Sequence, residues 1–205
     1  ESTIRRDFAL LESSNLITRT FGGAEVRPTP SLVAQGFEEK KNRQRKEKQA
    51  IAKAIAEPLD PGVLYSLDAG STVWHVASAL RARMPVTVVT PSLAVIEELG
   101  GVDEANIICT GGSFRLKTLD FVGTTAMATV EKVATNLAVV SVDSFVPGRG
   151  AFTVDGSSAE LSACLIKHAG ETILAVDHTK LARGGGYQVA RPDQIHRLVT
   201  DSGID

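Results

Sequence analysis

The alternation of apolar and polar positions divides the chain into three regions. In the first, residues 1–27, apolar side chains at Ile4, Phe8 and Leu11 recur at the spacing of one helical face. Residues 16–21 then alternate between apolar and polar, and the Gly-Gly pair that follows suits a two-residue hairpin turn. This region is predicted to form a helix and a β-hairpin. Because so short a segment cannot bury its own apolar stripe, we expect it to be the last part of a domain that starts before residue 1.

The second region, residues 28–57, is predicted to be a linker followed by a helix. Two prolines and a glycine mark residues 28–36 as the linker. Residues 37–57 have a helical pattern that is highly charged at first, with six basic residues between Lys40 and Lys48, and apolar later. The basic run is interpreted as a solvated helix face or a contact between subunits, with a contact to DNA as the alternative.

The third region, residues 58–205, alternates short apolar runs with helical patterns. Strands are expected at 63–67, 86–89, 107–109, 137–142, 172–176 and 197–200, and helices at 72–82, 92–99, 121–132 and 159–169. Because the strands lack a clean alternation and helices separate them, both faces of the sheet should be buried. The predicted fold class is therefore α/β, a mostly parallel sheet with helices on both faces.

Composition narrows the classes of function. Residues 1–56 have a net charge of +4 and residues 57–205 a net charge of −6, which favours a polyanion as partner of the front end. No apolar run approaches the roughly 18 residues of a membrane span, so an intracellular protein without a membrane segment is expected. Cys109 and Cys164 lie in apolar stretches and are expected to be small buried side chains. The histidines lack metal-ligand spacing and no nucleotide-binding motif occurs, so no metal or nucleotide cofactor is indicated.

Small polar clusters follow three of the expected strands. They read Asp-Ala-Gly-Ser-Thr at 68–72, Thr-Pro-Ser at 90–92 and Thr-Gly-Gly-Ser at 110–113, with two basic residues soon after the last. Ligands of open α/β sheets bind beyond the carboxyl ends of the strands, where helix N-termini offer free N–H groups to an anion. The alternative is that these clusters are ordinary helix caps and turns.

Further candidates at the same end of the sheet are two carboxylates, which could accept hydrogen bonds from sugar hydroxyls or act as acid and base, and one lysine that could contact a phosphate. The residues assigned to this effector site are Asp68, Gly70, Ser71, Thr72, Thr90, Ser92, Gly111, Gly112, Arg115, Lys117, Asp143, Glu160 and Lys180.

Motifs in the front end and in the body of the chain resemble those of the DeoR family of bacterial regulators. The front end reads Thr-Ile-Arg-Arg-Asp at 3–7 and Arg-Thr-Phe-Gly-Gly-Ala at 19–24. In the body, the three strand-end clusters and Asp-His-Thr-Lys at 177–180 match family positions in the same order. The resemblance covers essentially the whole chain.

The resemblance implies a winged helix-turn-helix, here 1–27, a connecting segment, 28–57, and a sensor domain, 58–205, similar to ribose-5-phosphate isomerase. It implies a cytoplasmic repressor of a sugar or carbohydrate catabolic operon that binds double-stranded operator DNA as a dimer or tetramer and responds to a phosphorylated sugar, without catalysis or a cofactor. The alternative is an isomerase-like enzyme that acts on sugar phosphates. The residues expected to face DNA are Ser2, Thr3, Arg5, Arg6, Arg19, Gly22 and Gly23.

Three positions depart from the family pattern. Pro91 stands where asparagine is usual, Ser144 where glycine is frequent, and Cys164 where a lysine is common in the helix expected to begin at Glu160. The last departure is expected to remove a cation from the site, which predicts either an atypical effector or reliance on the remaining basic residues.

Overall fold

The computed structural model describes residues 2–13, 17–20, 23–26, 32–181 and 184–204. The front end is a helix, α1 (Ser2–Ser13), and a two-stranded antiparallel hairpin. Its strands are β1 (Ile17–Thr20) and β2 (Gly23–Val26). The predicted helix and hairpin are confirmed, and the side chain of Ile4 is 61% exposed, as expected for a stripe that this segment does not bury by itself.

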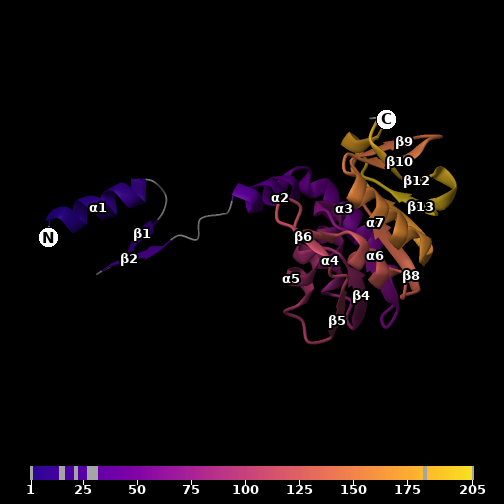
Figure 1. The fold of residues 1–205 in the computed structure, drawn as a ribbon, viewed down its shortest axis with the longest axis horizontal. Coiled ribbons are helices and arrows are strands. Elements are labelled where there is room, and N and C mark those ends of the chain that lie inside the picture. Colours follow the sequence, from indigo (N-terminus) through magenta and orange to yellow (C-terminus); the bar gives the residue numbers. More distant parts are fainter. Residues whose placement is uncertain (1, 14–16, 21–22, 27–31, 182–183, 205) are drawn as a thin grey trace.

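A six-stranded parallel sheet forms the centre of the remaining chain (Figure 1). Its strand order is β13-β11-β8-β3-β4-β5, and every neighbouring pair is parallel. The strands are β3 (Leu64–Leu67), β4 (Val86–Thr90), β5 (Ala105–Cys109), β8 (Thr135–Val140), β11 (Ala169–Ala175) and β13 (Arg197–Val199). All six coincide with expected strands to within a few residues, so the predicted fold class is confirmed.

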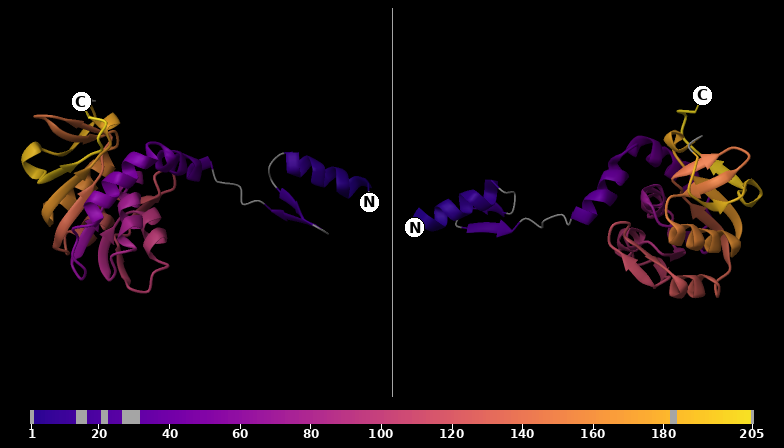
Figure 2. Two further views of the ribbon diagram at one scale, coloured as in Figure 1. Left: turned by 180° about the vertical axis from the view of Figure 1, so that it is seen from behind. Right: turned by 45° about the horizontal axis from the view of Figure 1, so that its top comes forward.

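Helices cover both faces of this sheet (Figure 2). They are α2 (Leu32–Asn42), α3 (Arg45–Ala56), α4 (Ser71–Leu80), α5 (Leu93–Leu99), α6 (Thr124–Val130) and α7 (Gly156–Lys167). In β8, Leu137 and Val139 pack with α3, α4 and α5, whereas Ala138 and Val140 pack on the opposite face with α7. Because successive side chains of a strand point to opposite faces, burial on both sides explains why the strand sequences are apolar throughout.

The predicted single helix at 37–57 is wrong. Two helices, α2 and α3, meet at a bend where Gln44 adopts a left-handed conformation with φ of 52°. The predicted linker is also too long, because α2 begins at Leu32. A charged segment of this kind gives no sequence signal for a break, since each half has an acceptable helical pattern.

The sequence pattern missed a small antiparallel hairpin and a second sheet. The hairpin joins β6 (Ser113–Arg115) to β7 (Asp120–Val122). The second sheet has the order β12-β10-β9, and two short 3₁₀-helices flank β12. These elements are β9 (Ser144–Val146), β10 (Gly150–Thr153), β12 (Tyr187–Ala190), η1 (His178–Lys180) and η2 (Pro192–Gln194). Segments of three or four residues are too short for their periodicity to be recognised.

The two cysteines differ in their surroundings. Cys164 is buried, as predicted, but Cys109 is exposed at the end of the edge strand β5, so the expectation of a buried side chain is wrong there. Among the residues that the structure describes, no helix combines the length and the apolar character that crossing a membrane requires. Within the same part of the chain, no group of His, Cys, Asp or Glu side chains is arranged to hold a metal ion.

Candidate functional site

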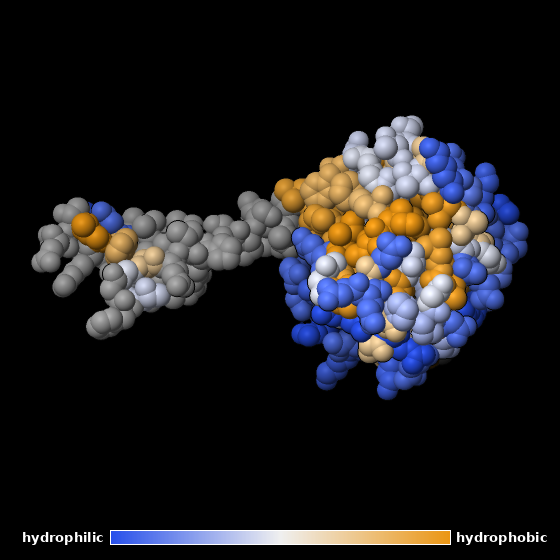
Figure 3. Space-filling view, turned by 90° about the horizontal axis from the view of Figure 1, so that it is seen from below, coloured by the Kyte–Doolittle hydropathy of each residue, from blue (hydrophilic) through white to orange (hydrophobic). Residues whose placement is uncertain are grey.

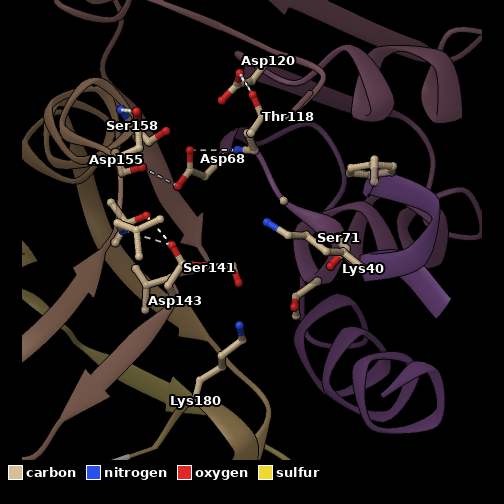
Figure 4. Close-up of a pocket in the computed structure, with 18 of the residues that line it drawn as sticks. Lys40, Asp68, Ser71, Thr118, Asp120, Ser141, Asp143, Asp155, Ser158 and Lys180 are labelled. Atoms are coloured by element: carbon tan, nitrogen blue, oxygen red, sulfur yellow. Dashed lines mark hydrogen bonds between the residues drawn. The ribbon is translucent and has the colours of Figure 1, made fainter. Parts of the chain in front are cut away.

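A cavity of about 250 Å³ opens at the carboxyl ends of the central strands (Figure 4). Its lining includes Asp68 after β3, Pro91 after β4, Ser141 after β8 and Asp177 after β11. The chain moves outward in one direction from β3 to β4 and β5, and in the other from β3 to β8 and β11. Ligands of open α/β sheets bind where the strand order reverses in this way, because the connecting segments diverge there.

The turn before α4 presents free backbone donors to this cavity. Gly70 precedes the helix with φ of 131°, a conformation that only glycine adopts readily, and no side chain caps the helix there. Ser71 and Thr72 line the cavity. The first N–H groups of a helix lack intrahelical acceptors and carry the positive end of the helix dipole, so this end of α4 suits an anion. The prediction for Gly70, Ser71 and Thr72 is consistent with this geometry.

Lys48 lies on α3 beside the same turn and was not predicted as a site residue. Only 5% of the residue is exposed. Its Nζ atom donates hydrogen bonds to the carbonyl oxygens of Lys40 and, at 2.8 Å, Arg43, and to Ser71 Oγ at 3.0 Å. Burial lowers the pKa of Lys48 to about 8 although the nearby Asp177 acts in the opposite direction.

Among the described residues, four further basic side chains line the cavity: Lys40, Arg43, Lys117 and Lys180. The basic run between Lys40 and Lys48 was interpreted as a solvated face or a subunit contact. That interpretation is wrong for Lys48, which is buried. Lys40 and Arg43 are exposed, as a solvated face requires, and the break between α2 and α3 also places them at the cavity. Lys117 and Lys180 line the cavity, and their predicted contact with an effector remains a prediction.

Carboxylates gather on the side of the cavity opposite Lys40 and Ser71 (Figure 4). Asp68 is buried and accepts hydrogen bonds from Ser162 Oγ at 2.7 Å and from the N–H of Ala69 at 2.8 Å. Burial raises its pKa to about 7, which these hydrogen bonds only partly offset. A carboxyl group in this condition can donate or accept a hydrogen bond near neutral pH.

Asp143 remains ionised on the same side of the cavity. Burial acts to raise its pKa, but hydrogen bonds from Thr153 Oγ1 at 2.7 Å and Val154 N–H at 3.1 Å, together with the charge of Lys180, lower it overall. Asp68 and Asp143 were both predicted, and both line the cavity. Together they offer acceptors to the hydroxyl groups of a ligand.

Arg115 was predicted to hold the ligand, and the structure gives it a different role. Its guanidinium binds Asp120 with two hydrogen bonds, of 2.9 and 2.6 Å, Asp155 at 2.6 Å and Ser158 at 2.7 Å. These carboxylates raise the pKa of Arg115 further, the four hydrogen bonds occupy four of the five N–H donors of its guanidinium, and the cavity lining does not include Arg115. Arg115 therefore fastens the β6–β7 hairpin to the first turn of α7.

The sequence matches known families along almost its whole length. Residues 43–202 match the DeoR C-terminal sensor domain, and residues 1–29 match the DeoR-like helix-turn-helix domain. The chain belongs to the DeoR family. It is 32% identical over 206 residues to the uncharacterized HTH-type transcriptional regulator YulB of Bacillus subtilis, with 100% of this chain and 79% of that protein covered. It is 30% identical to the HTH-type transcriptional repressor CsqR of Escherichia coli K12, with 97% and 76% covered.

Solved structures agree with the fold of the sensor domain. Ribose 5-phosphate isomerase A from Methanocaldococcus jannaschii aligns with a TM-score of 0.52 at 15% identity, over 68% of this chain and 55% of the isomerase. The eIF2B beta subunit from Chaetomium thermophilum aligns with a TM-score of 0.55 at 14% identity, over 80% and 54%. At such identities the likeness concerns the fold alone, and it confirms the predicted isomerase-like architecture. Membership of the DeoR family favours a transcription regulator over the isomerase-like enzyme.

Five other predicted site residues of this DeoR-family chain do not line the cavity: Thr90, Ser92, Gly111, Gly112 and Glu160. Thr90 and Ser92 are buried; Thr90 Oγ1 accepts the N–H of Ser92, and Ser92 Oγ accepts the N–H of Val95 at the start of α5. The alternative reading of this cluster, an ordinary helix cap, is therefore the one that the structure supports. Gly112 allows close packing, because a Cβ there would lie 2.6 Å from the carbonyl oxygen of Val122.

Glu160 was placed at the start of a helix, and this is wrong. The helix, α7, begins at Gly156, and its N-cap is Asp155, whose carboxylate accepts the N–H of Ser158. Glu160 is consequently an exposed residue one turn into the helix. A sequence cannot easily distinguish Asp155 from Glu160 as the start, since either acidic residue suits the first turn of a helix.

The three departures from the family pattern affect the site unequally. Pro91 lines the cavity. Cys164 is buried between α6 and α7, outside the cavity lining, so the expectation that it removes a cation from the site is wrong. Ser144 is buried in β9, and its hydroxyl has no hydrogen-bond partner among the described residues.

The predicted DNA-facing residues lie in the front end. Ser2, Thr3, Arg5 and Arg6 belong to α1, Arg19 to β1 and Gly23 to β2, whereas Gly22 falls outside the described residues. Of the arginines, Arg6 is exposed, and the side chains of Arg5 and Arg19 are not described. The match to the helix-turn-helix domain covers this whole segment, and the individual contacts remain predictions.

Proposed function

We propose that this chain is a repressor of a sugar or carbohydrate catabolic operon, and that a phosphorylated sugar bound in the cavity controls its affinity for operator DNA. The observation that carries the proposal is the pairing of an uncapped helix N-terminus with a cluster of basic side chains at the reversal point of the sheet. The E. coli relatives include the glycerol-3-phosphate regulon repressor, 26% identical over 200 residues.

The cavity suits a ligand with one anionic end and several hydroxyl groups. The phosphate would lie at the turn formed by Gly70, Ser71 and Thr72, near Lys40 and Lys180. The hydroxyl groups of the ligand would face the opposite side of the cavity, where Asp68, Asp143 and Ser141 offer acceptors (Figure 4). A volume of about 250 Å³ lies just below the roughly 300–1,000 Å³ that is typical of ligand pockets, which favours a compact ligand over a nucleotide.

We infer that the cavity binds its ligand without converting it and needs no cofactor. Several of its carboxylates are engaged with protein groups: Asp143 with Thr153, and Asp120 and Asp155 with Arg115. The pKa values of Asp143 and Asp155 are lowered in these surroundings, which weakens both carboxylates as general bases. Conversion of pentose or hexose phosphates at a rate above background would overturn this inference and restore the isomerase-like alternative.

The DNA-reading unit would be α1 with the β1–β2 hairpin, in a cytoplasmic protein that joins the nucleoid when it binds an operator. Paired half-sites require at least two heads, so we propose a dimer or tetramer. Apolar residues gather on one face of the sensor domain (Figure 3). Exposed apolar patches of this kind are typical of contacts between subunits.

Thermal unfolding against a panel of sugar phosphates, each beside its parent sugar, tests the proposal. A ligand present at about 100 times its Kd adds roughly 2.7 kcal/mol to the free energy of unfolding, a rise of roughly 5–10 °C in Tm for a chain of this size. One phosphate should stabilise the chain where its parent sugar does not. Lys180→Gln should reduce that shift, whereas Lys132→Gln, a change at an exposed residue away from the cavity, should not. Equal stabilisation by the parent sugar would refute the anion site.

A further inference from the structure

Lys48 is a buried ammonium group whose hydrogen-bond partners are all neutral. Two are backbone carbonyls, of Lys40 and Arg43, and the third is the hydroxyl of Ser71. Within the described ranges, no carboxylate lies within 4.0 Å of its nitrogen as an ion-pair partner. The charge of Asp177 acts on Lys48 without forming an ion pair. A buried charge that lacks an ion pair is unfavourable, so such a group readily binds an anion that reaches it. The cavity beside Ser71 gives an anion that access.

The three partners of Lys48 belong to two parts of the molecule. Ser71 is in the anion-binding turn at the start of α4, whereas Lys40 and Arg43 stand at the end of α2 and in the bend that follows it. α2 packs on α4, where the Lys41 ammonium lies 3.8 Å from the centroid of the Trp74 ring. In the sequence, α2 is the first element after residues 27–31, which connect it to the DNA-binding front end. Lys48 therefore connects the ligand turn with the segment that leads to the head.

An ammonium group has three hydrogen-bond donors, and all three of Lys48 are in use. An anion bound at Ser71 can gain a bond from Lys48 only if at least one existing bond is given up. A bond from an ammonium to a phosphate is stronger than one to a neutral group, so the anion would displace one of the three neutral acceptors, which are the carbonyl oxygens of Lys40 and Arg43 and the hydroxyl of Ser71.

The bonds of Lys48 to the two carbonyls lie at the bend between α2 and α3. Gln44 has φ of 52°, a conformation that is unfavourable for a residue with a side chain and persists only where the surroundings hold it. The carbonyls of Lys40 and Arg43 stand at the C-terminal end of α2, where a helix leaves its last carbonyls without intrahelical partners. Loss of the Lys48 bonds would thus leave both the carbonyls and the strained residue without their support.

We propose that Lys48 is the counter-ion of the effector's anionic group, and that effector binding transfers its ammonium from the carbonyls of Lys40 and Arg43 to that group, which releases the α2–α3 bend. The proposal rests on the proposed function, since it requires an anionic effector in the cavity. It assigns Lys48 as a binding residue and also identifies the route by which the occupied cavity acts on the head. By linkage, operator DNA that holds the bend in its present form must weaken effector binding to the same degree.

Hydrogen–deuterium exchange of the 205-residue chain, with inorganic phosphate and with D-ribose 5-phosphate as probes, tests this coupling. Binding should slow exchange at residues 68–75 and speed exchange at residues 40–48. Lys48→Gln should weaken binding of the probes by about 10- to 100-fold, the usual effect of losing a hydrogen bond to a charged group. The same variant should show fast exchange at 40–48 without any ligand. Lys46→Gln, a change at an exposed neighbour on α3, should behave as the unsubstituted chain.

Each outcome separates the two proposals. Slower exchange at 68–75 with unchanged or slower exchange at 40–48 would overturn the release of the bend and leave the sugar-phosphate sensor intact. Unchanged affinity in Lys48→Gln would overturn the counter-ion assignment. If neither probe, nor any sugar phosphate of the thermal panel, alters exchange in the unsubstituted chain, the proposed function fails and this proposal fails with it. The exchange pattern of the unsubstituted chain is decisive even if Lys48→Gln does not fold.

Discussion

Replacement of Arg115 by alanine distinguishes a structural from a ligand-binding role for this residue. The guanidinium holds Asp120 with two hydrogen bonds and reaches Asp155 and Ser158 on α7. If these contacts are its function, Arg115→Ala should destabilise the sensor domain. If the residue instead binds the effector, the same change should weaken ligand binding and leave the free energy of unfolding almost unchanged.

The magnitude follows from the exposure of each partner. The side chain of Asp120 is 6% exposed and that of Arg115 26%, so the pair is close to a fully buried ion pair. Removal of one partner from a buried ion pair lowers the free energy of unfolding by about 3–5 kcal/mol. Asp155 is 47% exposed, and pairs of this kind contribute at most about 1 kcal/mol. We therefore expect Arg115→Ala to lower the free energy of unfolding by about 2–4 kcal/mol, a fall of roughly 5–15 °C in Tm.

Urea unfolding followed by the fluorescence of Trp74, the chain's single tryptophan, measures this loss in the domain concerned. Arg191→Ala is the matched control, because Arg191 pairs with Asp193 at the surface, where both side chains are more than half exposed. The double change Arg115→Ala with Asp120→Asn should recover part of the loss, since it no longer leaves a buried charge unpaired. A loss below about 0.5 kcal/mol, equal to that of Arg191→Ala, would refute the structural role.

Three further predictions concern buried groups and one turn. Burial raises the pKa of Asp68 from 3.8 to about 7, so the folded chain binds the carboxyl proton more tightly than the unfolded chain does, and the free energy of unfolding should fall as the pH rises from about 4 to about 7. In urea unfolding, Asp68→Asn should remove this pH dependence, whereas Asp103→Asn, a change at an exposed residue, should retain it. Burial lowers the pKa of Lys48 from 10.5 to about 8, so the unfolded chain binds the ammonium proton more tightly, and the free energy of unfolding should rise as the pH rises from about 8 to about 10.5. If Lys48→Met shows the same dependence of the free energy of unfolding on pH as the unsubstituted chain, this prediction is wrong. Gly112→Ala should cost about 2–3 kcal/mol, because φ is +109° and a Cβ would meet a carbonyl, whereas Gly101→Ala, with open space around it, should stay within about 0.5 kcal/mol in the same assay.

The parallel sheet could be predicted because burial on both faces produces apolar runs, which are visible in the sequence without any knowledge of the partners. The turn at Gly70 and Ser71 could be predicted for a similar reason: glycine and hydroxyl residues after a strand are a local requirement of the turn itself. The position of Asp143 followed from the same rule, since it comes directly after the expected strand at 137–142 and three residues after the end of β8 at Val140.

Arg115 and Lys48 could not be assigned in this way, because their roles depend on residues distant in the chain. Arg115 finds Asp155 40 residues later, and Lys48 finds Ser71 23 residues later. A basic residue near a glycine turn has the same local pattern whether it faces a ligand or a buried carboxylate. For Lys48 the missing information was the break at Gln44, which turns the charged half of a predicted continuous helix toward the cavity.

The isomerase-like fold and the membership of a regulator family are reconciled by how the cavity uses its acidic groups. Asp143 accepts two hydrogen bonds from the β10 end, Asp177 holds the N–H of Thr179 at the start of η1, and Asp120 is held by Arg115. Carboxylates engaged in this manner keep the walls in place and present a fixed set of acceptors, which favours binding without rearrangement of the far wall. The basic side differs, because Lys48 has only neutral partners and Gln44 is strained. A ligand that joins the two sides would therefore move the basic one, and that side carries the helices that lead to the head.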